Sequence, residues 1–171
     1  IDATGDIGEY IRTGLNYAEW LENFRQGLTI QTNPRQMRLD ITLTLPGLFD
    51  VHNLVKLSND LNAMMLTKVC YAFDPKLLMS PLCLPRPLLD KMVNQLLDSV
   101  PANNRTSSLR DVLSNLKTRK TFEEEWPDTV KDGLKSGKAR ILKLESIRPS
   151  KTNMRSILAQ DPEILNWWVS I

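Results

Sequence analysis

A segment near residue 40 alternates strictly between apolar and polar side chains, and this pattern constrains the fold more than any other feature of the chain. Because successive side chains of a β-strand point to opposite faces, a period of two gives the strand one apolar and one polar face. The sequence therefore predicts a strand that ends at Pro46-Gly47. Its apolar face comprises Met37, Leu39, Ile41, Leu43 and Leu45, and its polar face comprises Arg38, Asp40, Thr42 and Thr44.

The segments around this strand predict a repeating strand–helix order. The opening Ile1-Asp2 is typical of the end of an apolar strand, and the capping box Asn16–Glu19 begins a helix that Gly27 is expected to end. Asp50 caps the next helix, and a second strand rich in β-formers is expected over residues 65–73. Strands that alternate with helices favour βαβ crossovers and a parallel sheet.

The rest of the chain is predicted to be helical. Residues 77–87 are rich in proline and form an ordered loop at best, and no convincing strand follows them. Pro127 is expected to begin a helix in its first turn. We therefore divide the chain into βα units over residues 1–85 and a helical extension over residues 86–171. Apolar spacing predicts helices over residues 88–97, 109–116, 141–147 and 162–168.

Composition excludes several classes of protein. The 171 residues carry 22 basic and 20 acidic side chains, a net charge of +2, which is too balanced for a nucleic-acid groove or a membrane surface. No stretch approaches the roughly 20 apolar residues of a membrane helix. Two cysteines in a chain of this size indicate a reducing compartment, so we expect a cytoplasmic protein. The opening on Ile1, without methionine and at the end of a strand, suggests a truncated chain.

Barrel geometry gives the polar face of the predicted strand a role. In a parallel sheet curled into a barrel, the outer face packs on helices and the inner face can surround a site. Ligands bind at the carboxyl ends of such strands. Thr42 and Thr44 lie nearest that end of the polar face, so they are the residues favoured to line a site.

Three stretches, taken in order, carry a family resemblance. They are Ile1-Asp2 with Asp6-Ile7-Gly8-Glu9-Tyr10-Ile11-Arg12-Thr13-Gly14, Tyr17, Trp20 and Asn23; the strand from Asp40 to Thr44; and Ile147-Arg148-Pro149-Ser150-Lys151-Thr152-Asn153-Met154 with Ile157-Leu158, Asp161-Pro162-Glu163-Ile164 and Trp167-Trp168. Together they resemble the fourth strand and helix, the fifth strand and the closing helix pair of radical S-adenosylmethionine enzymes with a twitch or SPASM-like extension. The resemblance covers most of the chain.

The resemblance implies an α/β fold, the C-terminal part of a partial (β/α)6 TIM-like barrel with parallel strands, followed by the helical extension. It also implies two cofactors in the full-length enzyme, S-adenosylmethionine and a 4Fe–4S cluster, which together give a 5′-deoxyadenosyl radical that abstracts a substrate hydrogen. The family's C-x3-C-x2-C loop is absent, because Cys70 and Cys83 have no third cysteine beside them. The cluster ligands are therefore expected in a missing N-terminal half of the same polypeptide, and this chain is expected to be inactive alone.

The same resemblance implies roles for particular residues. Asp2 accepts hydrogen bonds from ribose hydroxyls, and Arg12 pairs with the methionyl carboxylate through its planar guanidinium. Thr42 and Thr44 line the adenosine or substrate side. The substrate, a small molecule or a peptide, is expected to face Tyr71 and Asp74.

Simpler interpretations stand beside these. Asp2 can be a loop-initiating residue, Arg12 a solvated side chain or a surface ion pair of little energetic weight, and the two threonines ordinary residues of a half-exposed sheet. The run from Glu123 to Glu125 is typical of a solvated loop or a helix start rather than a pair of catalytic carboxylates. For the whole chain, the alternative is a non-catalytic α/β module that binds a protein or peptide through exposed strand edges and tryptophans.

Overall fold

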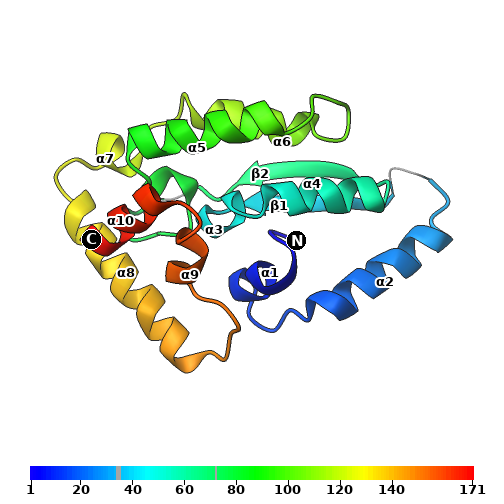
Figure 1. The fold of residues 1–171 in the computed structure, drawn as a ribbon, viewed down its shortest axis with the longest axis horizontal. Coiled ribbons are helices and arrows are strands. Elements are labelled where there is room, and N and C mark those ends of the chain that lie inside the picture. The colour runs from blue at the N-terminus through cyan, green and yellow to red at the C-terminus, as the bar shows by residue number, and fades with distance from the viewer. Residues whose placement is uncertain (34–35, 72) are drawn as a thin grey trace.

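The computed structural model describes residues 1–33, 36–71 and 73–171 of the chain (Figure 1). Within this part the protein is mixed α/β and mostly helical, with two strands that pair in parallel. Its elements in chain order are α1 (Gly5–Ile11), α2 (Tyr17–Ile30), β1 (Arg38–Leu43), α3 (Leu45–Leu48), α4 (Val51–Asp60), β2 (Met64–Val69), the 3-10 turn η1 (Pro81–Cys83), α5 (Arg86–Ser99), α6 (Ser107–Leu116), α7 (Phe122–Glu125), α8 (Val130–Ile147), α9 (Met154–Leu158) and α10 (Pro162–Ser170).

The strand predicted from the alternation is β1, and it pairs in register with β2 from Arg38 opposite Met64 to Leu43 opposite Val69. Helices α3 and α4 form the crossover between the two strands. The predicted core face of β1 is confirmed. Its inward side chains, Leu39, Ile41 and Leu43, are all at most 1% exposed.

The outer edge of β2 is covered by the segment that leads into α6, and α5 lies alongside α6 on the same side (Figure 1). The backbone N–H of Thr67 donates to the hydroxyl of Ser108 at 2.8 Å. The backbone N–H of Met65 donates to the carbonyl of Arg105 at 3.4 Å. These contacts occupy backbone groups that a further strand needs, so the sheet ends at β2.

The outer edge of β1 is bordered by the opening residues instead. The ammonium group of Ile1 donates to the carbonyl of Asp40 at 2.8 Å, and the next residue, Asp2, reaches the backbone of Thr42. The opening segment therefore runs beside β1 in the same direction, in the place of a third parallel strand. The structure assigns no strand to these residues, so the predicted first strand is present only as an extended segment.

The polar face of β1 is open to solvent. Arg38 and Asp40 form an ion pair at 2.9 Å, and both side chains are more than half exposed. On the same face of β2, Met64 and Leu66 are also exposed. Two strands with this orientation are compatible with the wall of a barrel, and the closed form of that barrel stays a prediction.

One buried cluster joins the two parts into which the sequence was divided. It contains Leu43 and Leu54 from the first part together with Leu89, Leu113 and Trp168 from the second. Burial of such side chains is worth about 1.5–3 kcal/mol each, so this cluster is the main source of stability. The division at residue 85 itself stays a prediction.

Two predicted helix boundaries are wrong. Helix α2 continues past Gly27 to Ile30, because the absence of a Cβ at Gly27 leaves room for the Met37 side chain, whose methyl carbon lies 2.7 Å from where that Cβ would be. Pro127 does not begin a helix. Trp126 before it leaves the helical region (φ −128°, ψ 58°), as residues before proline tend to, and α8 begins only at Val130.

The second strand is shorter than predicted. It ends at Val69, and Cys70 adds one further backbone hydrogen bond, to the carbonyl of Leu43 at 2.9 Å. Tyr71 and Phe73, which were expected to belong to the strand, are exposed residues beyond it. Ala72, which also fell within the predicted strand, lies outside the described residues.

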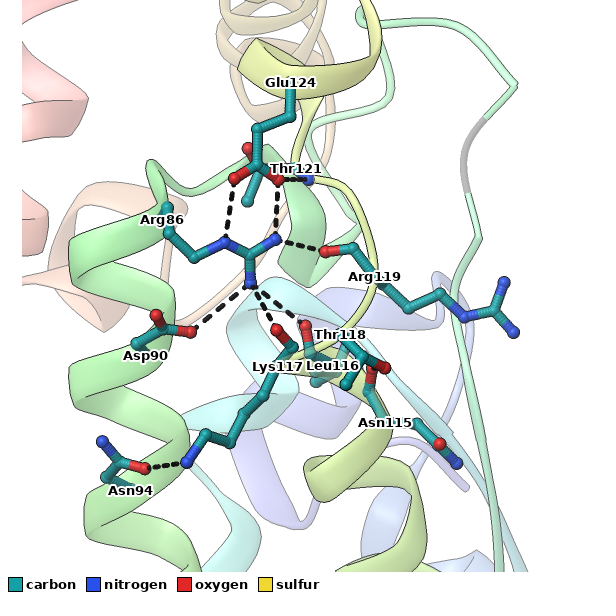
Figure 2. Close-up of polar contacts among 10 residues, drawn as sticks. All are labelled: Arg86, Asp90, Asn94, Asn115, Leu116, Lys117, Thr118, Arg119, Thr121 and Glu124. Carbon is teal, nitrogen blue, oxygen red and sulfur yellow. Dashed lines mark hydrogen bonds and ion pairs between the residues drawn. The ribbon is translucent and has the colours of Figure 1, made fainter.

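Arg86 joins helices α5, α6 and α7 through its guanidinium group (Figure 2). Its guanidinium donates to both carboxylate oxygens of Glu124, at 3.1 and 2.7 Å. It also donates to the carbonyl oxygens of Leu116 at 3.3 Å and Lys117 at 3.2 Å, and to that of Arg119. The last carbonyls of a helix have no partner within the helix, so Arg86, at the start of α5, supplies hydrogen-bond donors to the carbonyls at the end of α6. Its pair with Glu124 holds α7 beside them.

Candidate functional site

A buried carboxylate lies where the opening segment meets the carboxyl end of β1. The Asp2 residue is 5% exposed. Its Oδ1 accepts the backbone N–H of Thr42 at 3.0 Å, and its Oδ2 accepts Nε of Arg12 at 2.7 Å. A terminal guanidinium nitrogen of Arg12 also lies 3.3 Å from Oδ1, so the pair is bidentate. The structure therefore brings together three of the four residues predicted to bind the cofactor.

Two glycines allow the opening segment to approach this closely. A Cβ on Gly8 would lie 2.4 Å from the carbonyl oxygen of Ala3, and a Cβ on Gly47 would lie 2.9 Å from that of Asp2. Both distances are too short for a real side chain, so only glycine fits at either position. Ala3 is fully buried with its carbonyl beside Gly8 of α1, and the carbonyl of Asp2 lies beside Gly47 of α3. These close approaches fix the backbone that carries the Asp2 carboxylate.

A second buried carboxylate, Asp50, fastens the same segment. Its Oδ2 accepts the backbone N–H of Thr4, and its Oδ1 accepts the side-chain amide of Asn53 at 2.7 Å. Burial raises the pKa of Asp50, and these two hydrogen bonds act in the opposite direction. The sequence predicts Asp50 as a helix cap, and it does precede α4, but its carboxylate makes no cap hydrogen bond to that helix. It positions the opening segment instead.

The two threonines have different surroundings. The hydroxyl of Thr42 has no hydrogen bond within the described part of the chain, and the residue is half-buried. Thr44 is 4% exposed, and its hydroxyl oxygen accepts the backbone N–H of Gly47 at 3.0 Å, which caps α3. Thr42 is therefore available to a ligand, whereas Thr44 shapes the loop that follows β1.

Two residues to which the sequence analysis gave no role in this site lie near the group. Lys68 is the register partner of Thr42 on β2. Burial lowers the pKa of the Ile1 ammonium group, and the charges of Arg12 and, to a smaller degree, Lys68 act in the same direction. Cys70 follows β2, and burial raises the pKa of its thiol, with a smaller effect from the nearby charge of Asp2. Had the sequence revealed the register of the parallel pair, with Thr42 opposite Lys68, it would have predicted that Lys68 and Cys70 lie near this site.

The two predicted substrate-side residues lie apart from this hydrogen-bonded group. The hydroxyl of Tyr71 accepts a guanidinium N–H of Arg119 at 3.2 Å, and the guanidinium carbon lies 4.8 Å from the centre of the tyrosine ring. Asp74 accepts the backbone N–H of Lys76 at 2.8 Å. Neither side chain contacts Asp2 or Thr42, so their substrate role stays a prediction.

The residues present fit one of the two predicted cofactors in part. Each carboxylate oxygen has two acceptor positions, so Oδ2 of Asp2 keeps one beside the unengaged hydroxyl of Thr42, which suits a ribose diol. Arg12 is engaged with Asp2 and would hold that carboxylate in place. No three histidine, cysteine, aspartate or glutamate side chains gather to hold a metal in the described ranges, where Cys70 is half-buried and Cys83 is buried.

Comparisons of this chain with protein-family models, with curated proteins and with solved structures found no match in any of the three. No helix in the described ranges is long and apolar enough to cross a membrane.

Proposed function

We propose that the chain is the C-terminal portion of a radical S-adenosylmethionine enzyme and supplies part of its cofactor- and substrate-facing wall. The observation that carries the proposal is the order of the opening segment, β1 and β2. They lie side by side in sequence order and run in one direction, with a buried carboxylate at their carboxyl end. This is the arrangement of consecutive units in a βα barrel.

The two edges of the sheet support the same assignment. The β2 edge is closed by Arg105 and Ser108, so further strands can be added only beside the opening segment. A portion that ends a partial barrel needs its last strand covered in this way and its other edge available to the preceding units. The resemblance of the motifs in the opening and closing stretches is consistent with this place in the chain order.

In this proposal the chain binds and orients, and the chemistry belongs to the cofactors. S-adenosylmethionine bound at a reduced 4Fe–4S cluster supplies a radical that abstracts hydrogen from the substrate. Asp2 accepts a ribose hydroxyl, and Arg12 holds the carboxylate in its orientation through two hydrogen bonds. Thr42 offers its hydroxyl to the same sugar. The cluster ligands come from a preceding segment of the polypeptide.

The nucleoside part of the proposal is testable with this chain. S-adenosylhomocysteine has the same ribose and needs no cluster, so a titration followed by ¹H–¹⁵N spectra should shift the amide signals of Thr42 and Cys70. Asp2→Asn, which removes the charge and weakens the Arg12 pair, should weaken binding about tenfold, since hydrogen bonds to charged groups contribute about 1.5–3 kcal/mol. Asp40→Asn, on the open face of the neighbouring strand β1, is the matched control and should bind normally. Absence of any shift at millimolar ligand contradicts the assignment.

The cluster part is testable from the gene. A C-x3-C-x2-C triad in frame, roughly 80–120 residues upstream if about three βα units of ordinary loop length precede this segment, would support the proposal. An in-frame start codon directly before Ile1 with no such triad would refute it.

A second candidate function is a non-catalytic module that binds a protein or peptide. The observation that favours it is Phe73, which is 94% exposed, close in sequence to the exposed Tyr71. The two candidates differ in the behaviour of the isolated chain, which light scattering after gel filtration measures. An opening segment whose outer edge needs preceding strands leads to dimers or aggregates, whereas a complete binding module is a monomer of high thermal stability.

A further inference from the structure

A cavity of about 1060 Å³ lies between the turn that joins α1 to α2 and the segment that joins α8 to α9. Its walls come from two segments far apart in the sequence, residues 9–11 with 13–16 and residues 141, 144–145 and 148–153, and Met79 closes one side. The function proposed above uses none of the side chains that line it. Its size is at the upper end of cavities that hold small organic ligands, about 300–1,000 Å³.

The two walls are joined by Glu145 on α8. One of its carboxylate oxygens, Oε1, accepts the hydroxyl of Tyr10 at 2.7 Å and the backbone N–H of Met154 at 2.7 Å. Burial, followed by the hydrogen bond to Glu145, raises the pKa of Tyr10, so this tyrosine stays a neutral donor at physiological pH. At the exposed rim, Lys151 forms ion pairs with Asp6 at 3.5 Å and Glu9 at 4.0 Å. Oε1 of Glu145 and the ammonium group of Lys151 are thus already engaged at the boundary of the cavity.

The body of the cavity is apolar. Aliphatic and thioether side chains from three segments face it, and they offer a ligand dispersion contacts and release of water but no hydrogen bonds. These side chains are Ile11, Leu15, Met79, Ile141 and Leu144.

One charged group in the lining differs from the rest. Arg148 follows the end of α8 and lines the cavity, yet its guanidinium has no hydrogen bond or ion pair to any described residue. Asn16 uses its side-chain oxygen to accept the N–H of Glu19, which leaves its amide N–H groups without an acceptor in the described ranges. The unused polar groups at the mouth therefore include a guanidinium and an amide donor, whereas the carboxylate of Glu145 already has two donors. The complement of this arrangement is an anion attached to an apolar body.

We propose that this cavity binds an amphipathic organic anion, a carboxylate or sulfonate carried on an aromatic or aliphatic body, with the anionic group on Arg148. The guanidinium presents a planar fork that matches such an oxyanion. The apolar lining takes the body of the ligand. This assignment is independent of the nucleoside site at Asp2, because the two sites share no residue.

Two fluorescent probes separate the contributions of charge and apolar contact. Anilinonaphthalene sulfonate carries an anion on an aromatic body, and N-phenyl-1-naphthylamine has the same body without the anion. Fluorescence titration should give saturable binding of both probes to the wild-type chain. Arg148→Met should weaken the sulfonate about tenfold, as loss of a charged hydrogen bond does, and leave the neutral probe within twofold. Arg140→Met, an exposed arginine of α8 outside the cavity, is the matched control and should change neither.

A cavity-filling variant locates the bound probe. Leu144→Trp should weaken both probes at least fivefold, because the larger ring occupies the space that their aromatic body needs. The proposal is overturned if Leu144→Trp changes neither affinity, if Arg148→Met weakens both probes equally, or if Arg140→Met matches its effect on the sulfonate. Amide shifts confined to residues 12–16 and 148–153 on adding the sulfonate support it, and shifts spread over the whole chain contradict it.

Discussion

Replacement of Arg86 should destabilise the protein more than replacement of any exposed arginine, because this side chain holds α5, α6 and α7 together (Figure 2). Arg86→Met keeps the aliphatic stem and removes the guanidinium. The substitution therefore breaks the bidentate pair with Glu124 and the hydrogen bonds to three carbonyls, those of Leu116, Lys117 and Arg119.

The magnitude follows from the exposure of these groups. The side chain of Arg86 is 25% exposed and that of Glu124 is 41% exposed, so the ion pair is screened and contributes at most about 1 kcal/mol. Each hydrogen bond to a neutral carbonyl has a net value of about 0.5–1.5 kcal/mol, near the low end here because water can reach these carbonyls. The expected loss in the free energy of unfolding is about 2–3 kcal/mol.

Urea denaturation followed by tryptophan fluorescence and by circular dichroism measures this loss. Arg86→Lys keeps a charge but lacks the planar fork, so it should recover less than half of the lost stability. Arg38→Met is the matched control, because its partner Asp40 is on the open sheet face, and it should lie within about 0.5 kcal/mol of the wild type. Equal losses for Arg86→Met and Arg38→Met would refute the reasoning.

Three further predictions concern stability and thiol reactivity. Gly137→Ala should lower the free energy of unfolding by about 1–3 kcal/mol, because the new Cβ would lie 2.4 Å from the carbonyl of Lys76. Gly27→Ala should be neutral or stabilising by up to about 1 kcal/mol, since the flexible end of the Met37 side chain can move aside. Thermal melts of the two variants test this contrast, and equal losses of stability would contradict it. The hydrogen bonds from Arg86 and the backbone of Thr121 lower the pKa of Glu124 from 4.5 to about 2, so the stabilisation from this carboxylate is fully present above about pH 4.5 and is lost as the pH falls toward 2. Urea midpoints between pH 2 and 6 should therefore fall more steeply for the wild type than for Glu124→Gln, and parallel curves would exclude the pairing. Burial raises the pKa of both thiols and encloses Cys83 completely, so a thiol reagent at pH 8 should modify Cys70 slowly and Cys83 only after unfolding; two equal rates in the native protein would disagree with the structure.

The local elements of this protein could be predicted where the pattern is short-range. Alternation identified β1 and its buried face, because a period of two has no other regular interpretation. Apolar spacing identified α5 and α10. Helix α10 begins at Pro162, directly after Asp161, whose side chain accepts the N–H groups of Glu163 and Ile164. The acidic run at 123–125, expected to be a solvated loop or a helix start, lies in the short helix α7, which begins at Phe122.

The wrong boundaries have non-local causes. The sequence favours a helix end at Gly27 because glycine is common at the C-terminal ends of helices. Helix α2 continues because Met37, ten residues later, packs into the space that a Cβ of Gly27 would occupy. The Arg86–Glu124 pair joins residues 38 positions apart, and no periodic pattern reports a contact of that separation.

The candidate sites divide in the same way. The sequence by itself pointed to Asp2, Arg12, Thr42 and Thr44, because strand ends and a family resemblance are readable along the chain. Only the tertiary structure decided that Arg12 binds Asp2, that Thr44 caps α3, and that the 9–16 and 141–153 segments enclose a cavity. The physical reason is that residue identity and local period are properties of neighbouring positions, whereas burial, ion pairing and cavities arise from where distant segments pack.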